Sequence, residues 1–211
     1  LEAHGWKKYF RVDLMDAEGP DLELSIPEGK VIQKNFVGKN MKNYDSILVL
    51  SHFKGHPMGG YGGALKQLAI GCASSYGKAY VHGAGDPEKI WTSDHDSFLE
   101  SMADADRSVM DYMGRENIVY INVANRLSVD CDCDAHPHDP EMGDIGIFAS
   151  ADPVALDQAC VDAVYASEDD GKAALIERIE SRNGIHTVEA AHSLGLGSRR
   201  YELRCIDSYK N

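Results

Sequence analysis

Residues 47–66 read ILVLSHFKGHPMGGYGGALK, an apolar run that leads directly into a glycine-rich segment. The run from Ile47 to Leu50 is apolar throughout, which is typical of a strand buried on both faces of a sheet. The residues that follow the glycines favour a helix over residues 64–72. A strand, a glycine-rich turn and a helix in this order indicate an α/β unit, and such units bind ligands beyond the carboxyl ends of their strands.

Apolar strands and helical segments alternate along the rest of the chain. The hydrophobic pattern and the turn residues predict strands at residues 22–26, 31–37, 118–123, 145–149 and 201–205, and helices at residues 97–113, 152–166, 172–182 and 186–194. Two helix starts have a specific signal, because Ser97 with Glu100 fits a capping box and Asp152 stands as an N-cap before Pro153. The alternation predicts an α/β fold, a Rossmann-like three-layer arrangement with a mostly parallel sheet. We expect a single domain over residues 1–211 that lacks its N-terminal part, because the chain begins at Leu1 rather than at Met.

The composition excludes several classes of partner. The 211 residues include 21 Lys and Arg against 34 Asp and Glu, a formal net charge of −13 at pH 7. Nucleic acids and acidic membrane surfaces bind basic patches, so we expect neither as a partner. A hydrophobic content of 43% suffices for a core, but no apolar run reaches the roughly 18 residues that a membrane-spanning helix needs. Five scattered cysteines do not resemble a disulfide framework, which favours a reduced, cytoplasmic location.

The glycine-rich segment is the first candidate site. Two histidines and two lysines stand in or beside it: His52, Lys54, His56 and Lys66. Four glycines would let a ligand approach the backbone closely: Gly59, Gly60, Gly62 and Gly63. The N-terminus of the following helix favours an anion, and no nucleotide motif occurs in the chain. The segment predicts a site for a small-molecule or anionic ligand, with a glycine-rich crossover and solvent-facing basic side chains as the alternative.

The loop at residues 130–144, DCDCDAHPHDPEMGD, is the second candidate site. It holds six acidic residues and no Lys or Arg, so nearly half of the net charge of −13 lies in this loop. Its other metal-ligating side chains are Cys131, Cys133, His136 and His138. Thiolate and imidazole suit zinc, copper or iron, and a bound cation would relieve the repulsion among the carboxylates. The loop therefore predicts a metal site, with an acidic solvated loop whose cysteines are incidental as the alternative.

Asp152 and Asp157 are the third candidate. Asp152 is most simply a helix cap. Asp157 follows one turn later, where a buried carboxylate would need a lysine or a bound cation as its partner. Both are kept as ligand-binding candidates, although the structural interpretation is favoured.

These motifs, in this order, resemble the domain-of-unknown-function 362 family, whose members are described as uncharacterised iron–sulfur centre proteins. The matching stretches are residues 51–66 with 71–74, residues 131–133, residues 144–157, and residues 194–197 with 201–203. They span most of residues 45–205. The resemblance implies an iron–sulfur or other redox association. The ferredoxin-like insert with Cys-x-x-Cys motifs that many members carry does not follow His82 in this sequence.

A more distant resemblance is to the nickel-pincer lactate racemases. His56, the Gly60-Tyr61-Gly62-Gly63 turn, Lys66 and His82 have the spacing of that family's motif. The resemblance implies that Lys66 tethers the cofactor and that His82 binds the metal. It also implies that His56 is an acid/base catalyst, a role that suits an imidazole.

Three functions are compatible with the sequence. The first is a metal-dependent, redox-associated protein whose loop at residues 131–138 holds an unidentified transition metal (iron, zinc or nickel). The second is a small-molecule isomerase or racemase-like enzyme that uses His56 as acid/base and Lys66 as anchor or carboxylate binder. The third is a non-catalytic accessory domain whose partner is a redox protein.

Overall fold

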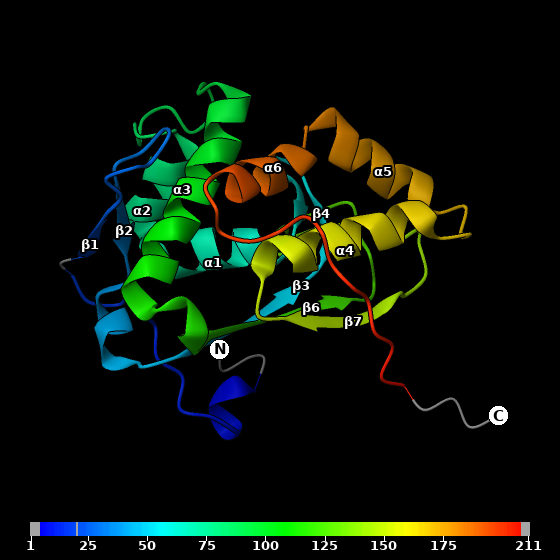
Figure 1. The fold of residues 1–211 in the computed structure, drawn as a ribbon, viewed down its shortest axis with the longest axis horizontal. Helices are drawn as coiled ribbons and strands as arrows, with labels where there is room; N and C mark the ends of the chain where they lie inside the picture. The colour runs from blue at the N-terminus through cyan, green and yellow to red at the C-terminus, as the bar shows by residue number, and fades with distance from the viewer. Residues whose placement is uncertain (1–4, 20, 208–211) are drawn as a thin grey trace.

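Strand β3 (Ile47–His52) contains the apolar run and is the first strand of a three-stranded sheet (Figure 1). The structure is a computed structural model that describes residues 5–19 and 21–207. β3 lies parallel to β6 (Ile118–Ala124), and β6 lies antiparallel to β7 (Gly146–Ser150). The order β3-β6-β7 places β6 at the centre, where its backbone groups pair on both sides.

The other elements of the described residues are two antiparallel strand pairs, three short 3-10 helices and six α-helices. The strand pairs are β1 (Leu22–Ser25) with β2 (Lys34–Val37), and β4 (Lys54–His56) with β5 (Gly60–Gly62). The 3-10 helices are η1 (Trp6–Lys8), η2 (Lys39–Asn43) and η3 (Arg115–Asn117). The α-helices are α1 (Ala64–Cys72), α2 (Ser75–His82), α3 (His95–Met113), α4 (Pro153–Ala166), α5 (Lys172–Ser181) and α6 (Ile185–Ser193).

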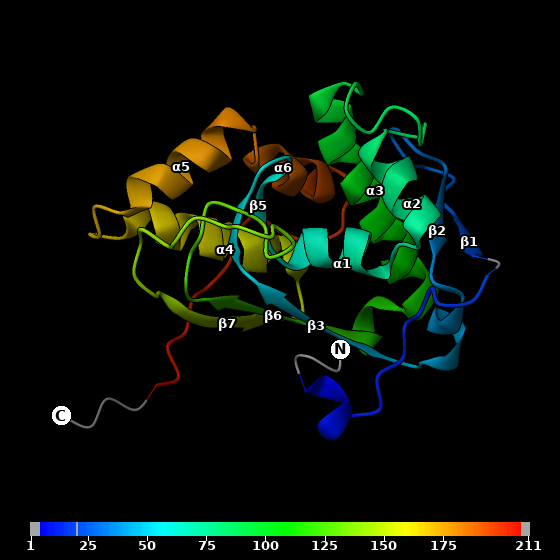
Figure 2. The ribbon, with the colours of Figure 1, turned by 180° about the vertical axis from the view of Figure 1, so that it is seen from behind.

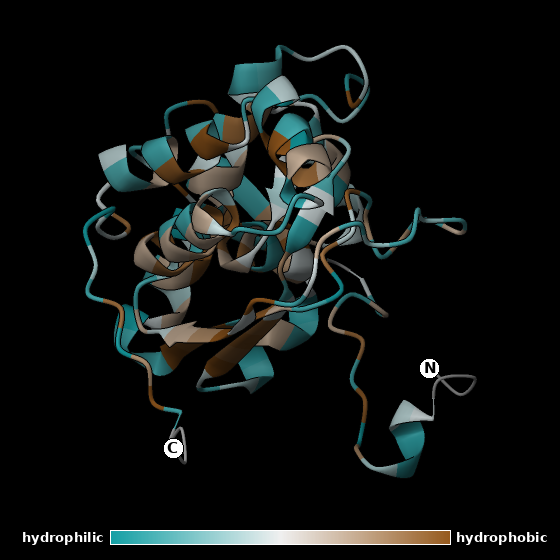
Figure 3. Cartoon of the chain, turned by 90° about the vertical axis from the view of Figure 1, so that its right-hand side faces the viewer, coloured by the Kyte–Doolittle hydropathy of each residue, from teal (hydrophilic) through white to brown (hydrophobic). Residues whose placement is uncertain are grey.

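Helices cover one face of the main sheet. α1 packs on β3, α4 packs on β6 and β7, and α3 packs against α1 and α6 on the same side (Figures 1 and 2). Val49 and Tyr120 point to this side and are buried. On the opposite face the side chains of Leu48 and Leu50 are 60% and 59% exposed. Figure 3 shows these apolar strands at the side of the molecule away from the helices.

The α/β class is confirmed, but the Rossmann-like arrangement expected from the sequence is not. One of the two pairings in the main sheet is antiparallel, and the α-helices of the described residues lie on one face of that sheet rather than on both. The connection from β6 to β7, at residues 125–145, is a loop without a crossover helix. The chain therefore returns antiparallel beside the strand that it has just left.

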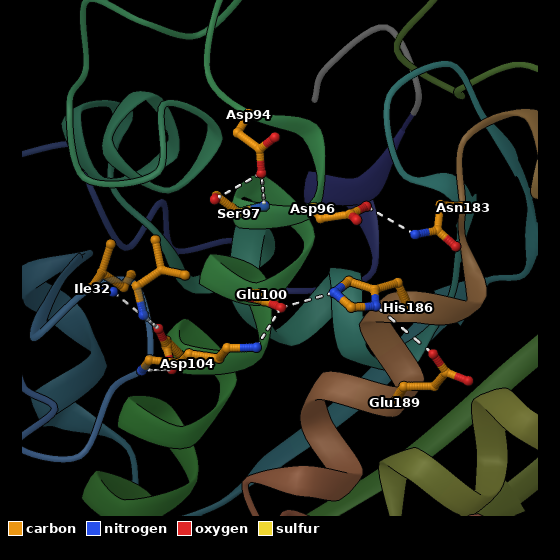
Figure 4. A network of polar contacts seen from close by, with 11 residues as sticks. Ile32, Asp94, Asp96, Ser97, Glu100, Asp104, Asn183, His186 and Glu189 are labelled. Atoms are coloured by element: carbon orange, nitrogen blue, oxygen red, sulfur yellow. Dashed lines mark hydrogen bonds and ion pairs between the residues drawn. The ribbon is translucent and has the colours of Figure 1, made fainter.

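A polar network joins α3 to the segment before β2 and to α6 (Figure 4). The fully buried carboxylate of Asp104 accepts hydrogen bonds from the backbone N–H groups of residues 30–32, at 2.8, 2.7 and 3.0 Å. One turn earlier, Glu100 contacts the ammonium of Lys30 at 2.6 Å and Nε2 of His186 at 2.9 Å. These contacts fix two separate parts of the chain, residues 30–32 and α6, to one face of α3.

Two helix starts test the capping signals. Asp152 caps α4 as predicted, because its side chain accepts the backbone N–H of Ala155 at 2.9 Å. α3 begins two residues before the predicted start at residue 97, because its N-cap is Asp94, which accepts the backbone N–H of Ser97 at 2.9 Å. The predicted capping box at Ser97 is therefore wrong.

Two further assignments differ from the sequence prediction. The strand expected at residues 201–205 is wrong, since residues 201–207 have no regular secondary structure. Helix α2 was not predicted, although Ser74 marks its start by accepting the backbone N–H of Gly77 at 3.0 Å. No helix among the described residues is long and apolar enough to cross a membrane.

Candidate functional site

The glycine-rich segment folds into a short hairpin rather than a single turn. β4 and β5 pair with Lys54 opposite Gly62, and α1 follows directly. A β-carbon at Gly62 would lie 3.2 Å from Nζ of Lys54 and 3.7 Å from Cδ of Lys66. The two lysine side chains therefore lie together over Gly62. We call Lys54 and Lys66 the lysine pair.

The N-terminus of α1 is occupied by a carboxylate of the protein itself. The buried carboxylate of Asp157, on α4, accepts the backbone N–H groups of Ala64 at 2.8 Å and Leu65 at 3.0 Å. It also accepts hydrogen bonds from the hydroxyl of Tyr61 at 3.0 Å and from Nδ2 of Asn122 at 2.7 Å. Burial raises the pKa of Asp157, and these hydrogen bonds oppose that rise. The helix N-terminus is thus satisfied from within the fold.

Asp152 and three of the four predicted ligand-binding glycines also serve contacts within the protein. The second carboxylate oxygen of Asp152 accepts the backbone N–H of Ser198 at 2.8 Å. A β-carbon at Gly63 would lie 2.5 Å from Asp157, and one at Gly60 would lie 2.8 Å from the backbone of Gly184. Gly59 meets the same turn between α5 and α6, because its carbonyl would lie 3.1 Å from a β-carbon at Gly184. Of the four glycines, Gly62 is the one that lies against the lysine pair.

The lysine pair has no carboxylate bound to it. Lys54 is 5% exposed and Lys66 is half-buried. Among the described residues, no hydrogen bond or ion pair involves the ammonium group of either lysine. Burial lowers the pKa of Lys66 and the charge of Lys54 adds to this, while the Cys131 thiolate opposes it. Two desolvated ammonium groups side by side form an environment that favours an anion.

The loop that leads to Cys131 and Cys133 packs on Gly55, next to Lys54, and the charges of the lysine pair act on Cys131. The sulfur atoms of this cysteine pair lie 2.8 Å apart, with the Cys133 thiol donating to Cys131 Sγ. Burial opposes ionisation of Cys131, but this hydrogen bond, the backbone N–H of Cys133 and the charges of the lysine pair outweigh it and lower the pKa of the Cys131 thiol. The hydrogen bond to Cys131 and partial burial raise the pKa of Cys133. Of the two thiols, Cys131 is therefore the one that ionises more readily.

His56 is held as a neutral imidazole. Its Nδ1 accepts the backbone N–H groups of Met58 at 3.2 Å and Gly59 at 3.0 Å, so we assign its proton to Nε2. Burial, followed by the charges of Lys66 and Lys54, lowers the pKa of His56 to about 2. At neutral pH His56 is a hydrogen-bond donor, and this geometry does not favour the acid/base role implied by the racemase resemblance.

His52 borders a cavity of about 400 Å³ at the carboxyl ends of β3 and β6. Its Nδ1 faces Asp132 Oδ1 at 2.8 Å and its Nε2 faces the carbonyl of Asn125 at 2.7 Å, so both ring nitrogens have partners within the protein. Cys131 also lines this cavity, whereas the lysine pair does not. Cys131 is therefore a cavity-lining residue on which the charges of both lysines act.

The predicted metal ligands do not converge. Nδ1 of His138 pairs with Asp130 at 2.7 Å, a contact that raises the pKa of His138, and His136 is exposed. His82 lies on α2, where Nδ1 donates to the carbonyl of Lys78 at 2.7 Å, and burial lowers its pKa. Among the described residues, no group of three His, Cys, Asp or Glu side chains is placed to hold a metal ion.

Comparison with protein families identifies the chain. The model of the family described as a domain of unknown function (DUF362) matches residues 1–162. The chain belongs to this family. No curated protein and no solved structure matches it. The lysine pair, the cysteine pair and His56 all lie within the part that matches DUF362.

An iron–sulfur cluster does not fit the cysteines of this DUF362 chain. Such clusters are held by four thiolates, or by two thiolates and two histidines in one variant. Cys72 and Cys160 are buried, and burial raises the pKa of Cys72 to about 12. Cys205 is exposed near the end of the described chain. The cysteine pair is the one place where two described thiols meet, and no described histidine or further thiol is placed beside it to complete either kind of cluster.

Two side chains of the DUF362 site were not predicted from the sequence. Arg178 on α5 lies 3.7 Å from Asp130, and its charge also acts on His56. No local pattern marks Arg178, because its role depends on how α5 packs against the hairpin. Tyr61 had a signal, since it is the single large side chain within the glycine cluster, and its hydroxyl donates to Asp157.

Proposed function

We propose that this protein is a redox-associated, small-molecule-binding protein. In this proposal the lysine pair binds an anionic group of the ligand, and the Cys131 thiolate is the reactive group beside it. One observation carries the proposal: two largely desolvated ammonium groups lie together over Gly62, have no carboxylate partner among the described residues, and lower the pKa of a cysteine through their charge.

The charge of the site favours an anion over a metal cation. A metal ion at the cysteine pair would be repelled by the lysine pair, and the repulsion is strong where water is excluded. The two nearest carboxylates have positively charged or polar partners of their own, because Asp130 contacts His138 and Arg178 while Asp132 contacts His52. An anion entering from the cavity would meet Cys131 first and then the two ammonium groups.

Each residue has a distinct part in this proposal. Lys54 and Lys66 supply the positive charge that orients a carboxylate or phosphate group. His56 supplies a neutral N–H donor within the same buried neighbourhood, a role that its Nε2 tautomer allows. Cys131 supplies a nucleophilic sulfur, and the same positive charges that bind the ligand keep this sulfur ionised.

Anion binding tests the proposal directly. The affinities of inorganic phosphate and of succinate are measured by calorimetry for the wild type and for Lys54→Met and Lys66→Met. We expect each substitution to weaken binding about tenfold or more, or about 1.4 kcal/mol. Lys42→Met is the matched control, because Lys42 is exposed and lies on η2, outside the site. Equal affinities for all four proteins, or no binding of either anion, would reject the proposal.

The metal prediction needs a separate measurement. Elemental analysis of protein purified without a metal-affinity tag should show iron, zinc or nickel at close to one equivalent if the loop binds a metal. A metal-free result would reject that function and leave anion binding unaffected.

A racemase-like isomerase is the second candidate, because the charge of Lys66 acts on both His56 and His82. A 2-hydroxy acid would bind through its carboxylate to Lys66. Interconversion of D- and L-lactate that is lost in Lys66→Met, together with a covalent mass adduct on Lys66, would support it. An unmodified Lys66 with no interconversion would reject it.

A further inference from the structure

The cysteine pair has the arrangement of a dithiol that can close. Cys131 Sγ and Cys133 Sγ lie 2.8 Å apart, and a disulfide bond needs about 2.05 Å, so closure requires less than 1 Å of sulfur movement. A tight turn holds the two together, because the backbone N–H of Asp134 donates to the carbonyl of Cys131 at 2.9 Å. The intervening Asp132 is turned toward His52.

We propose that Cys131 and Cys133 exchange with small anionic disulfides, and that the lysine pair selects these substrates by their charge. This inference rests on the proposed function, since it uses the same two lysines as the anion site. It adds a substrate class, disulfides of low molecular weight that bear carboxylates, and a reaction, thiol–disulfide exchange.

The two sulfurs divide the reaction between them. Cys131 lines the cavity and Cys133 does not, so Cys131 is the sulfur that a ligand in the cavity meets, within reach of the charges of the lysine pair. Cys133 is exposed and already donates its hydrogen to Cys131, so it is placed to attack Cys131 in turn. The other cysteines cannot replace it, since Cys72 and Cys160 are buried elsewhere and Cys205 lies in the C-terminal segment.

The exchange balances in two steps. The Cys131 thiolate attacks one sulfur of the small disulfide, the S–S bond of that molecule breaks, and one thiolate leaves and takes a proton from water. Cys133 then loses its proton to solvent and attacks Cys131, which forms the protein disulfide and releases the second small thiol. Two protein thiols are oxidised, and one small disulfide is reduced to two thiols.

Substrate charge is the property that the site can distinguish. Asp130 is paired with His138 and Arg178, and Asp132 is paired with His52, whereas the lysine pair has no carboxylate partner among the described residues. The charge left near Cys131 for a ligand to bind is therefore that of the lysine pair. We therefore expect glutathione disulfide, which is anionic, to react faster than the neutral hydroxyethyl disulfide. Cystamine, which is cationic, should react slowest.

The experiment compares these three disulfides with the full chain in a Cys205→Ser background, which removes the other exposed thiol. Thiol loss gives the rate, and intact mass with peptide mapping identifies the bond. We expect glutathione disulfide to react at least tenfold faster than cystamine, and Lys54→Met or Lys66→Met to reduce this ratio to about twofold, with Lys42→Met unchanged. Cys133→Ser should stop at one glutathione on Cys131.

Three results would overturn the inference: a rate that does not depend on disulfide charge, an adduct of Cys133→Ser at another residue than Cys131, or no bond between Cys131 and Cys133 in the mapped peptides. Failure of the proposed function is distinguishable from these results. If phosphate and succinate bind through the lysine pair but no exchange occurs, the anion site stands and the dithiol chemistry is wrong.

Discussion

At the scale of single residues, Asp106 on α3 is a carboxyl group in the core whose two oxygens have no hydrogen-bond partner among the described residues. Burial, and then the nearby Asp157 carboxylate, raise the pKa of Asp106 well above its ordinary value. The unfolded chain loses this proton near pH 4, and the folded chain keeps it to a much higher pH. Between the two pKa values the folded state binds one more proton, so stability falls as pH rises, by up to about 1.4 kcal/mol per pH unit.

Asp106→Asn should remove this pH dependence. We expect the variant to gain stability relative to the wild type as the pH is raised from 4 to 8, measured by urea unfolding at each pH. Asp111→Asn, at an exposed position on the same helix, is the control and should leave the pH dependence in place. Parallel stability curves for the wild type and Asp106→Asn would mean that Asp106 is ionised in the folded protein.

Cys131 provides a second test at this scale. The lysine pair and the Cys133 thiol lower the pKa of Cys131, so its alkylation by iodoacetamide should begin at a lower pH than that of a cysteine in an unstructured peptide. Lys66→Met should move the Cys131 profile toward higher pH and slow alkylation at pH 7 several-fold. Peptide mass spectrometry distinguishes Cys131 from the other cysteines. An unchanged profile in Lys66→Met would contradict the electrostatic assignment.

The sequence indicated which side chains could bind or react, but it did not indicate which partners those side chains would contact. The glycine-rich segment and the Cys-Asp-Cys motif both marked side chains that meet in the fold. The sequence could not tell that the ring nitrogens of His52 would face Asp132 and Asn125, because those partners lie more than 70 residues away. Nor could the sequence tell that the Asp157 carboxylate would accept backbone N–H groups of a different helix, α1.

At the scale of elements, α1 depends on a cap that comes from α4. Its N-cap, Gly63, has no side chain, and Asp157 accepts the first N–H groups instead. Asp157→Ala should destabilise the protein by about 3–5 kcal/mol, because it leaves several buried donors without a partner. Asp162→Ala, at an exposed position on α4, should cost less than about 1 kcal/mol. Both values come from urea unfolding.

Gly63→Ala tests the same contact from the other side. A β-carbon at Gly63 would lie 2.5 Å from Asp157 Oδ1 and would push the carboxylate away from the helix, although the backbone conformation suits alanine. Gly63→Ala should therefore destabilise the wild type but have little further effect on the free energy of unfolding in the Asp157→Ala background. Additive effects of the two substitutions would show that Gly63 acts through something other than this cap.

Strands and helices with a long apolar run or a clear capping signal could be predicted from the sequence. The glycine-rich β4–β5 hairpin could not. The apolar runs located β3 and β6, and the Asp-Pro signal located α4. The β4–β5 hairpin has strands of three residues each, too short for any alternation of side chains to show. Its pairing is set by the packing of the loop before Cys131 on Gly55, whose N–H donates to the carbonyl of Ser128 at 2.7 Å.

At the scale of the whole molecule, the sequence was least able to predict the antiparallel direction of β7 and the absence of described helices from one face of the sheet. A continuous apolar run indicates burial on both faces, yet it does not distinguish a covered sheet from one with an open apolar face. Here the register aligns Leu48 with Val119 and Leu50 with Ile121 on the face that carries no helix of the described chain. Which face the helices cover depends on the path of the segments that connect the strands, and the residues of the apolar run at 47–50 do not determine that path.

The open face yields a prediction about the folded chain as a unit. Leu48 and Leu50 are 60% and 59% exposed, so replacing both with Thr, a β-branched residue that favours strands, should change the free energy of unfolding by less than about 1 kcal/mol. Val49 lies between them on the covered face and is 4% exposed, so Val49→Ala should cost about 2 kcal/mol. Urea unfolding of the wild type and both variants at one protein concentration gives the comparison. If the double variant loses as much stability as Val49→Ala, the apolar face is covered in solution, and repeating the measurement over a range of protein concentrations then shows whether a second copy covers it.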